Sequence, residues 1–214
     1  MKIKTIVVGP VQTNCYLVTD EQTGKTTVID PGMKTPALEK AIKDIGVENV
    51  SLILLTHGHF DHITGLPFVR ELTGAPVAIH EADGDFLTGG NLNLARIFSQ
   101  GKPQKAADRL LKDGDKISCG ALEFTVVHTP GHTPGGCCFL CGDTMFSGDT
   151  LFFRTVGRTD FPHSSPADML RSIGKLRALS GDYTVLPGHD RATTLQDERD
   201  KNPYFDRENY DYID

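Results

Sequence analysis

The sequence predicts an α/β (α+β) fold of four layers, an αββα sandwich, in which two sheets pack face to face and helices cover their outer sides. Segments with the character of strands come in runs in both halves of the chain, and each run is closed by helical segments. No change in composition marks a linker between the halves. A length of 214 residues suits one compact domain, so we expect residues 1–214 to form a single domain.

The first half is predicted to alternate strands with helices. Runs of β-branched and apolar residues bounded by turn residues indicate strands, in chain order, at 3–9, 14–20, 25–30, 51–55 and 75–80. Apolar residues that share one helical face predict a helix over 35–45, which Gly46 ends, and another over 66–72. Residues 84–106 show no clear periodicity and are predicted to form a long loop, which in a compact domain usually covers a site.

The second half repeats this pattern. Strands are predicted within 116–127, as a hairpin over 136–149, and at 183–187. A helix over 166–179 is predicted to take Ser164 or Ser165 as its cap and to hold Pro166 in its first turn. A final short helix is predicted over 193–201.

Composition narrows the class of protein. The 22 Lys and Arg against 28 Asp and Glu give a net charge of −6, which argues against a nucleic-acid partner. No apolar run has the length of a membrane span and the first residues lack a signal-peptide layout, so we expect a cytoplasmic protein without a membrane partner. Five Cys without a regular framework indicate reduced thiols, and the pair Cys138 and Cys141 is predicted to be part of a strand rather than a zinc clip. The oligomeric state stays open.

Four side chains that can bind a metal lie within six residues, directly after a predicted buried strand: His57, His59, Asp61 and His62. Imidazole and carboxylate suit zinc, and also iron or manganese. The spacing does not place two histidines on one helical face, so we expect a loop, in which Gly58 lets the backbone turn. Without a metal, this crowding would carry a desolvation cost, so the cluster predicts a metal site.

Three further candidate ligands lie at predicted strand ends beside Gly or Pro. They are His132 in HTPGHTPG, Asp149 in SGDTLF and His189 in LPGHD. Each of the three is weak evidence for a metal site when taken alone. Two of them also have a neighbour that could be the ligand instead: His128 precedes His132 by four residues, and Asp143 lies in a near-copy of the motif that contains Asp149. We favour His132 because His128 can end its strand as an ordinary residue, and Asp149 because Asp143 lies at the predicted hairpin turn.

These motifs together resemble those of a known family. In chain order, THGHFDHITG, HTPGHTPG, SGDTLF and LPGHD look like the metallo-β-lactamase superfamily, and NCYLV, VIDPG and GRTDF look closest to its glyoxalase II-like hydrolases. The resemblance extends over about the whole chain and implies the αββα sandwich of that family, with the site at one edge. It implies one metal held by His57, His59 and His132, a second held by Asp61, His62 and His189, and Asp149 bridging the two.

The resemblance also implies roles for other residues. Two divalent cations are expected, with zinc favoured over iron or manganese. Asp30 matches the family's strand-end aspartate and would hold the ligand loop, and the same role is expected of Thr56. Arg158 in GRTDF would bind a carboxylate of the substrate, although a surface salt bridge is an equally good interpretation. The residues expected to take part in catalysis are Asp61, His62 and Asp149.

The site so described implies hydrolysis of a small-molecule thioester, as in hydroxyacylglutathione hydrolases. A hydroxide shared by two metals would attack the carbonyl carbon. A thiolate leaves without needing a proton, which suits a site whose acidic and basic groups are all used as ligands. Only 25 residues follow His189, so we expect most of the glutathione pocket of glyoxalase II enzymes to be absent and recognition to depend on residues 84–106 and Arg158.

Other functions fit the sequence less well. A persulfide dioxygenase would use a single Fe(II) on His57, His132 and Asp149 and would leave the other ligands idle. A non-catalytic metal-binding module is disfavoured because structural zinc sites are closed, whereas a bridged pair leaves a position for water. A secreted β-lactamase is disfavoured because no export signal is seen, and an RNA-processing nuclease because of the acidic charge. A flavodiiron oxidoreductase would be expected to carry Glu in place of His59.

Overall fold

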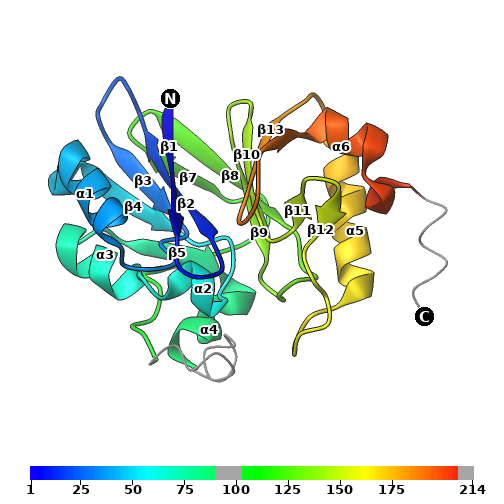
Figure 1. Cartoon of the computed structure of the whole chain (residues 1–214), viewed down its shortest axis with the longest axis horizontal. Coiled ribbons are helices and arrows are strands. Elements are labelled where there is room, and N and C mark those ends of the chain that lie inside the picture. Colours follow the sequence, from blue (N-terminus) through cyan, green and yellow to red (C-terminus); the bar gives the residue numbers. More distant parts are fainter. Residues whose placement is uncertain (90–102, 207–214) are drawn as a thin grey trace.

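The computed structural model describes residues 1–89 and 103–206, and its two large sheets face each other with helices on both outer sides (Figure 1). The first sheet has six strands in chain order: β1 (Lys2–Val8), β2 (Thr13–Thr19), β3 (Thr26–Ile29), β4 (Val50–Leu54), β5 (Val77–His80) and β6 (Arg109–Leu111). The second has the spatial order β14 (Thr193–Thr194), β13 (Thr184–Pro187), β10 (Thr144–Gly148), β9 (Cys137–Cys141), β8 (Leu122–His128) and β7 (Lys116–Cys119).

Helices complete the four layers. The first sheet is covered by α1 (Pro36–Ile45) and α3 (Leu66–Thr73), and the second by α5 (Pro166–Arg177) and α6 (Leu195–Lys201). Short helices α2 (Phe60–Ile63) and α4 (Gly84–Thr88) lie at the lower edge in Figure 1, and a small ribbon of β11 (Leu151–Phe152) and β12 (Thr155–Val156) lies near α5. This arrangement confirms the predicted αββα sandwich. No helix in the described ranges is long and apolar enough to cross a bilayer.

Aromatic side chains fill the space between the two sheets. Phe124, Phe139 and Phe146 from the second sheet are fully buried against Tyr16 and its neighbours from the first. The rings of Tyr16 and Phe146 meet edge to face with centroids 5.3 Å apart. Burial of each such side chain contributes on the order of 1.5–3 kcal/mol, so this layer fixes how the sheets sit on one another.

The helix ends follow the predicted local chemistry. The Thr35 hydroxyl accepts the Leu38 N–H at the start of α1, and Gly46 ends that helix with a φ of 93°. At the start of α5, the Ser165 hydroxyl accepts the Asp168 N–H, so Ser165 rather than Ser164 is the cap. Both helices therefore begin where predicted, and α1 also ends where predicted, whereas α5 ends at Arg177, two residues before the predicted end.

Parallel pairing places several strand ends at one edge of the sandwich. Strands β3, β4 and β5 run parallel in the first sheet, and β10 and β13 run parallel in the second. The carboxyl ends of parallel strands meet at the same edge of a sheet. Residues that directly follow β3, β4, β10 and β13 are therefore brought together, although they are distant in the chain.

The loop predicted over 84–106 is wrong in its first five residues and right at 103–106, which form neither helix nor strand. Residues 84–88 form helix α4, in which Phe86 and Leu87 are buried. The reason is tertiary packing: Leu87 joins the core of the first sheet, and the ring of Phe86 lies beside that of His59 with centroids 6.2 Å apart. Local periodicity reveals neither contact. Residues 90–102 of the predicted loop lie outside the described residues.

Other short elements also differ from the prediction. The helix predicted over 193–201 begins at Leu195, because Thr193 and Thr194 pair with β13 as an edge strand. The metal-ligand segment predicted as a loop contains one helical turn, α2. Strands β6, β11 and β12 were not predicted, since two or three residues carry too little pattern to identify a strand.

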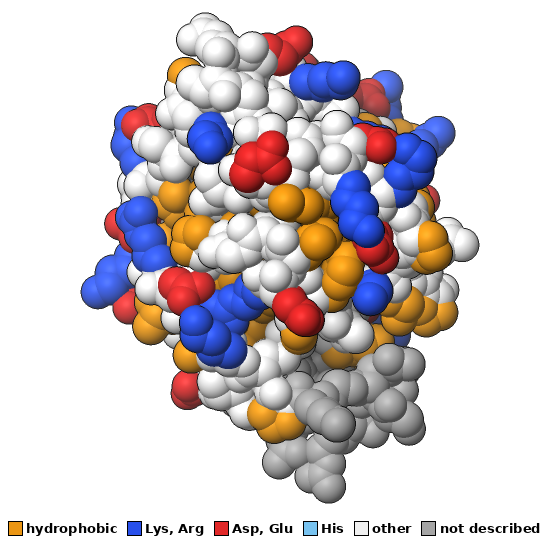
Figure 2. Space-filling model, turned by 90° about the vertical axis from the view of Figure 1, so that its left-hand side faces the viewer, with side chains coloured by type: hydrophobic (Ala, Val, Ile, Leu, Met, Phe, Trp, Pro, Cys, Tyr) orange, Lys and Arg blue, Asp and Glu red, His pale blue; other side chains and the backbone are white. Residues whose placement is uncertain are grey.

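The surface on the side of α1 and α3 carries acidic and basic side chains next to one another around a central group of hydrophobic ones (Figure 2). Interspersed charges of both signs are typical of an ordinary solvated face rather than of a broad basic field. The candidate metal ligands lie instead at the edge where the strand ends converge.

Candidate metal centre

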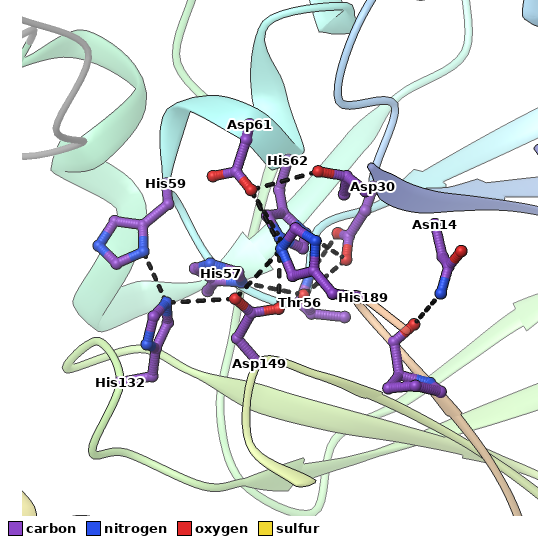
Figure 3. Close-up of polar contacts among 12 residues, drawn as sticks. Asn14, Asp30, Thr56, His57, His59, Asp61, His62, His132, Asp149 and His189 are labelled. Carbon is purple, nitrogen blue, oxygen red and sulfur yellow. Dashed lines mark hydrogen bonds and ion pairs between the residues drawn. The ribbon is translucent and has the colours of Figure 1, made fainter. Parts of the chain in front are cut away.

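Seven candidate ligands converge at the edge of the sandwich (Figure 3). Their ligand atoms form three overlapping groups, each within 4.8 Å. The groups are His57, His59 and His132; His57, His62 and Asp149; and Asp61, His62 and His189. The structure thus brings together every residue that the sequence predicted as a ligand, and metal binding by them stays a prediction.

Hydrogen bonds fix which nitrogen of His57 faces the centre. Thr56 Oγ1 donates to Asp30 Oδ2 at 2.6 Å, so it is free to accept from His57 Nδ1 at 3.1 Å. With its proton on Nδ1, His57 presents the lone pair of Nε2. That Nε2 is buried and has no hydrogen-bond partner among the described residues. A buried lone pair without a donor fits a metal ligand.

Three more histidines show the same arrangement. Their Nδ1 atoms lie at 3.0 Å from Asp30 Oδ2 for His62, at 2.8 Å from the Arg158 carbonyl for His132, and at 3.1 Å from the Val11 carbonyl for His189. Carboxylates and carbonyls only accept, so each of these rings donates through Nδ1 and turns its Nε2 toward the centre.

His59 is oriented the other way round. Its Nδ1 lies 2.8 Å from His132 Nε2, while its Nε2 is buried without a partner in the described chain. Two facing ring nitrogens need a proton or a cation between them. Burial, with nearby His132, lowers the pKa of His59 to about 3, and burial also lowers the pKa of His57 well below its usual value. Both rings are therefore neutral at pH 7, the form that binds metals.

Asp149 lies between the groups. Its Oδ1 is 3.3 Å from His62 Nε2, and its Oδ2 is 3.4 Å from His132 Nε2 and 3.5 Å from His189 Nε2. Burial works to raise the pKa of Asp149, but the charge on His62 and hydrogen bonds from His189 and His62 hold it well below its usual value. An ionised carboxylate that touches both halves of the cluster is placed to bridge two cations.

The carboxylates also change the pKa values of the histidines in the group formed by Asp61, His62 and His189. His189 Nε2 lies 3.2 Å from Asp61 Oδ2. Burial works to lower the pKa of His189, but hydrogen bonds with Asp149 and Asp61 raise it to about 10. The same carboxylates, with Asp30, raise the pKa of His62 above its usual value against the effect of burial. This half of the cluster concentrates negative charge, which a cation would neutralise.

Asp30 and Thr56 lie where the resemblance placed them. Asp30 accepts hydrogen bonds from the Thr56 backbone N–H at 2.8 Å and from its hydroxyl, and it contacts His62. It is 1% exposed and adopts a positive φ of 51°, a conformation that Asp tolerates better than most residues. Asp30 therefore ties the end of β3 to the ligand segment that follows β4.

A residue that the sequence did not reveal, Asp83, joins two ligand segments. Its carboxylate accepts the N–H groups of Gly58 at 2.9 Å and Gly135 at 2.6 Å, and the Thr133 hydroxyl at 2.8 Å. It is fully buried, and burial raises its pKa despite these three donors. The contacts hold the His57–His59 segment against the segment that carries His132. Nothing in the local sequence of Asp83 marks this role, because its partners lie 25 and 52 residues away.

The segment that carries His189 is held by β2. Asn14 Nδ2 donates to the carbonyls of Pro187 at 3.0 Å and Asp190 at 2.9 Å, and the Tyr16 hydroxyl donates to the Pro187 carbonyl at 2.6 Å. Figure 3 shows Asn14 directed toward this segment. Because Asn14 and Tyr16 belong to the first sheet, these bonds lock the His189 segment of the second sheet across the interface.

Gly58 has a different role from the predicted one. Its backbone does not adopt a positive φ, so it makes no turn that requires glycine. A Cβ at this position would instead collide with the Phe86 side chain of α4. Glycine is needed here because the ligand segment packs closely against α4.

The rival residues do not reach the cluster. His128 stacks on His80 with ring centroids 3.8 Å apart, and its Nε2 contacts the Pro134 carbonyl at 2.8 Å. Asp143 lies in the turn between β9 and β10. Neither belongs to a group of converging ligand atoms in the described residues. Cys138 and Cys141 are buried on strand β9, in agreement with their predicted place in a strand.

A cavity of about 350 Å³ opens beside the cluster. Its wall combines ligand residues with apolar side chains, namely Val11, Phe60, Phe152 and Phe161. Arg158 and Asp190 lie at its rim. The guanidinium of Arg158 donates to both carboxylate oxygens of Asp160 at 2.9 and 2.8 Å and lies over the Phe161 ring. The structure thus places Arg158 at the cavity, already paired with a carboxylate, and its binding of a substrate stays a prediction.

Comparison with known proteins identifies the family. A model described as the metallo-beta-lactamase superfamily matches residues 8–189. ML0493 of Mycobacterium leprae, 37% identical over 96% of this chain and 99% of its own length, is named only as uncharacterized. A protein of Haemophilus influenzae named hydroxyacylglutathione hydrolase GloC is 32% identical over 96% of this chain and 98% of its own.

Two solved structures have the same fold. The BLEG-1 B3 metallo-beta-lactamase has a TM-score of 0.88 and 34% identity, and the match covers 95% of this chain and 99% of that one. TTHA1623 in a di-iron-bound form has a TM-score of 0.83 and 34% identity over 94% of this chain and 99% of its own. With its ligand cluster at the edge of an αββα sandwich and this match along most of its length, the chain belongs to the metallo-beta-lactamase superfamily.

Proposed function

We propose that this chain is a two-metal hydrolase of thioesters. The observation that carries the proposal is the convergence of seven ligand atoms in two halves that share Asp149, directly beside an open cavity. Membership of the metallo-beta-lactamase superfamily supports a metal-dependent hydrolase, and the thioester is our own addition. Hydrogen bonds at Nδ1 turn the Nε2 atoms of His57, His62, His132 and His189 toward the centre, which fits a site that binds cations.

The residues present can be divided between two cations. His57, His59 and His132 would hold one, Asp61, His62 and His189 would hold the other, and Asp149 would contact both. Bound divalent metals supply an activated water at neutral pH and a Lewis acid for the oxygen of a carbonyl. Zinc is our preferred metal because the ligands are imidazole and carboxylate, although the similarity to a protein with a di-iron form keeps iron as the alternative.

The remaining groups around the cavity favour a leaving group that needs no proton. Apart from the ligands, the ionisable side chains that line it among the described residues are Arg158 and Asp190. A guanidinium does not give up a proton in this way, and Asp190 is an exposed carboxyl at the rim. A thiolate, whose conjugate acid has a pKa of about 8.5, leaves without general-acid help, whereas an amine does not.

The length of GloC bears on the thiol carrier. That relative carries the name hydroxyacylglutathione hydrolase and matches this chain over 98% of its own length. The short stretch after His189 is therefore no argument against a glutathione thioester as a substrate. We therefore keep S-acylglutathione among the candidate substrates.

The mononuclear iron alternative makes a different use of the same residues. It would leave His59, Asp61, His62 and His189 without a ligand role, yet their nitrogen and oxygen atoms converge as closely as the others. A non-catalytic metal module is at odds with the cavity that opens on the cluster. Both observations favour the two-metal hydrolase.

The test combines metal counting with an assay panel. We expect elemental mass spectrometry to find two metal ions per chain. We also expect the protein with two metals to hydrolyse thioesters faster than a lactone or a penicillin. His132→Ala should lose metal, and His128→Ala, its matched control, should keep it. One iron per chain with oxygen uptake on glutathione persulfide would replace the proposal by the dioxygenase. Selective cleavage of the penicillin would identify a β-lactamase instead.

A further inference from the structure

An aromatic ring of the cavity wall lies beside each half of the ligand cluster. The Phe161 ring is roughly perpendicular to the rings of His59 and His132, with centroids 5.7 and 5.8 Å away. The Phe152 ring has its centroid 6.2 Å from that of His189. A group that is bound at the cluster and extends into the cavity therefore meets aromatic surface next to either set of ligands.

The cavity has further apolar side chains on its wall, and most of the surface that it presents is apolar. We call Val11, Phe60, Phe152 and Phe161 the apolar wall. Val11 is 44% exposed, Phe152 and Phe161 are half-buried, and Phe60 packs against Phe161. Apolar side chains that stay open to solvent beside a cluster of polar ligands are typical of a surface that a ligand covers.

The other polar side chains of the cavity do not favour a charged group on the substrate. Apart from the candidate ligands, those that line it among the described residues are Thr155, Arg158 and Asp190. Arg158 donates to both carboxylate oxygens of Asp160, and its guanidinium lies 4.4 Å from the centre of the Phe161 ring. A carboxylate on the substrate would compete with Asp160 for Arg158 and would approach the exposed carboxylate of Asp190. An apolar group meets neither cost.

We propose that the apolar wall selects thioesters that carry an apolar acyl group, and that Phe161 is the main specificity-determining residue. This inference rests on the proposed function, since it assumes that the thioester carbonyl lies at the ligand cluster. The acyl group then lies against the rings of Phe152 and Phe161. Hydrolysis breaks the C–S bond, forms a C–O bond to the oxygen of water, and releases the apolar carboxylic acid and the thiol.

The acyl part of a thioester fits this cavity better than the thiol carrier does. The volume of about 350 Å³ is near the lower end of the range of roughly 300–1,000 Å³ that ligand pockets have. It suits the reacting carbonyl and one compact group rather than a whole carrier. The peptide or phosphate groups of a carrier would also lose hydrogen bonds to water against the apolar wall. A phenylacetyl group has no polar atom beyond its carbonyl, and it gains free energy by burying its ring.

The experiment varies the acyl group on one small neutral thiol, N-acetylcysteamine. For acetyl, phenylacetyl and succinyl thioesters, kcat/KM is divided by the rate of hydroxide-catalysed hydrolysis of the same ester, which removes differences in intrinsic reactivity. In the wild type, the phenylacetyl ester should exceed the acetyl ester by about 10- to 100-fold. The succinyl ester, which carries a carboxylate, should not exceed the acetyl ester.

Variants of the wall test its part in this preference. Phe161→Ala should reduce the preference for phenylacetyl over acetyl by about three- to tenfold, and Phe152→Ala should reduce it less. Phe153→Ala is the matched control and should keep the preference. This neighbouring ring is also half-buried, but it contacts the guanidinium groups of Arg154 and Arg191 and does not line the cavity.

Three results would overturn the inference. The first is a wild type that does not prefer the phenylacetyl ester, and the second is a preference that Phe161→Ala retains in full. The third is a preference for the succinyl ester that Arg158→Ala removes, which would show that Arg158 binds a carboxylate of the substrate.

Failure of the proposed function can be told apart from failure of this inference. If the wild type cleaves no thioester, the proposed function fails, and calorimetry with uncleavable ketone thioethers, R–CO–CH₂–S–R′, still tests the wall. Tighter binding of the analogue with a benzyl group as R than of the methyl analogue, by the wild type but not by Phe161→Ala, would support the apolar wall. Equal binding of the two analogues by the wild type would refute it.

Discussion

At the scale of single residues, oxygen atoms behind the histidines set the geometry of the metal centre. Asp30, Thr56 and two backbone carbonyls receive the Nδ1 protons of four ligand rings. Each ring is thereby fixed in one tautomer and one orientation before a cation binds. Metal binding then loses less conformational entropy, because the side chains are already ordered.

Asp83 gives the first prediction at this scale. Because it holds the Gly58 and Gly135 segments, Asp83→Ala should weaken metal binding by about 10- to 100-fold and lower the free energy of unfolding by about 1–3 kcal/mol. Metal affinity is measured by competition with a chelator, and stability by urea unfolding. Asp85→Ala, two residues away on the exposed side of α4, is the control. Equal metal affinity of Asp83→Ala and the wild type would show that the ligand segments position themselves.

His80 gives a prediction on pH. Burial, and then the stacked His128, lower the pKa of His80 to about 4, from about 6.5 in an unfolded chain. Between these values the unfolded state binds more protons, so this stability is fully present above pH 6.5 and is lost as the pH falls toward 4. Glu81, Asp113 and Asp115 oppose the shift.

We therefore expect His80 to make the chelator-treated protein about 1–2 kcal/mol less stable at pH 5 than at pH 7. His80→Gln should remove that part of the pH dependence of urea unfolding, and His163→Asn at an exposed position should not. The same pH dependence in His80→Gln and wild type would mean that the stacked pair accepts a proton without cost.

At the scale of elements, the start of α5 is joined to a ligand segment. The Ser165 N–H donates to the Gly131 carbonyl at 2.8 Å, and the Ser164 hydroxyl donates to the His132 carbonyl at 2.7 Å. The cap of α5 and the position of His132 therefore depend on the same two serines. The N-terminal end of α5, which the sequence shows only as a local helix signal, therefore also holds the segment that carries His132.

The cap of α5 carries the prediction at this scale. Ser165→Ala loses the bond to the Asp168 N–H and should lower the free energy of unfolding by about 1 kcal/mol in urea. Ser165→Asn, which can accept the same bond, should restore most of it. If the alanine and asparagine variants are equally stable, the hydroxyl does not stabilise the helix. Ser164→Ala should act differently, by lowering metal affinity at His132 more than it lowers stability.

At the scale of the whole molecule, the metal centre joins the two halves of the sandwich. His57, Asp61 and His62 follow strands of the first sheet, whereas Asp149 and His189 follow strands of the second. A cation held by both sets would link the sheets at this edge.

Metal removal should therefore affect the stability of the whole fold. Chelator is expected to lower the melting temperature, because the closely spaced Asp61 and Asp149 carboxylates lose their counter-charge, and added zinc should restore it. Scanning calorimetry of protein with and without metal checks this. An unchanged melting curve in protein shown to be metal-free would mean that the aromatic layer alone holds the edge together.

The sequence by itself determined most strands and helices and the chemistry of the site. Periodicity and turn residues depend on neighbours in the chain, so they predicted α1, α3 and α5 and the strands between them. The ligand types were evident because His57, His59, Asp61 and His62 crowd one strand end.

Only the tertiary structure decided what depends on contacts between distant segments. It turned His128 away from the cluster, onto the ring of His80. It packed the Phe86 side chain against Gly58, where no larger residue fits. It also brought Asp83 next to Gly135, which lies 52 residues away in the chain. The same packing formed the cavity at the metal centre, whose walls come from segments between Val11 and Asp190. The physical reason is that secondary structure follows from local backbone preferences, whereas the direction of a side chain and the space beside it are fixed only when the layers pack.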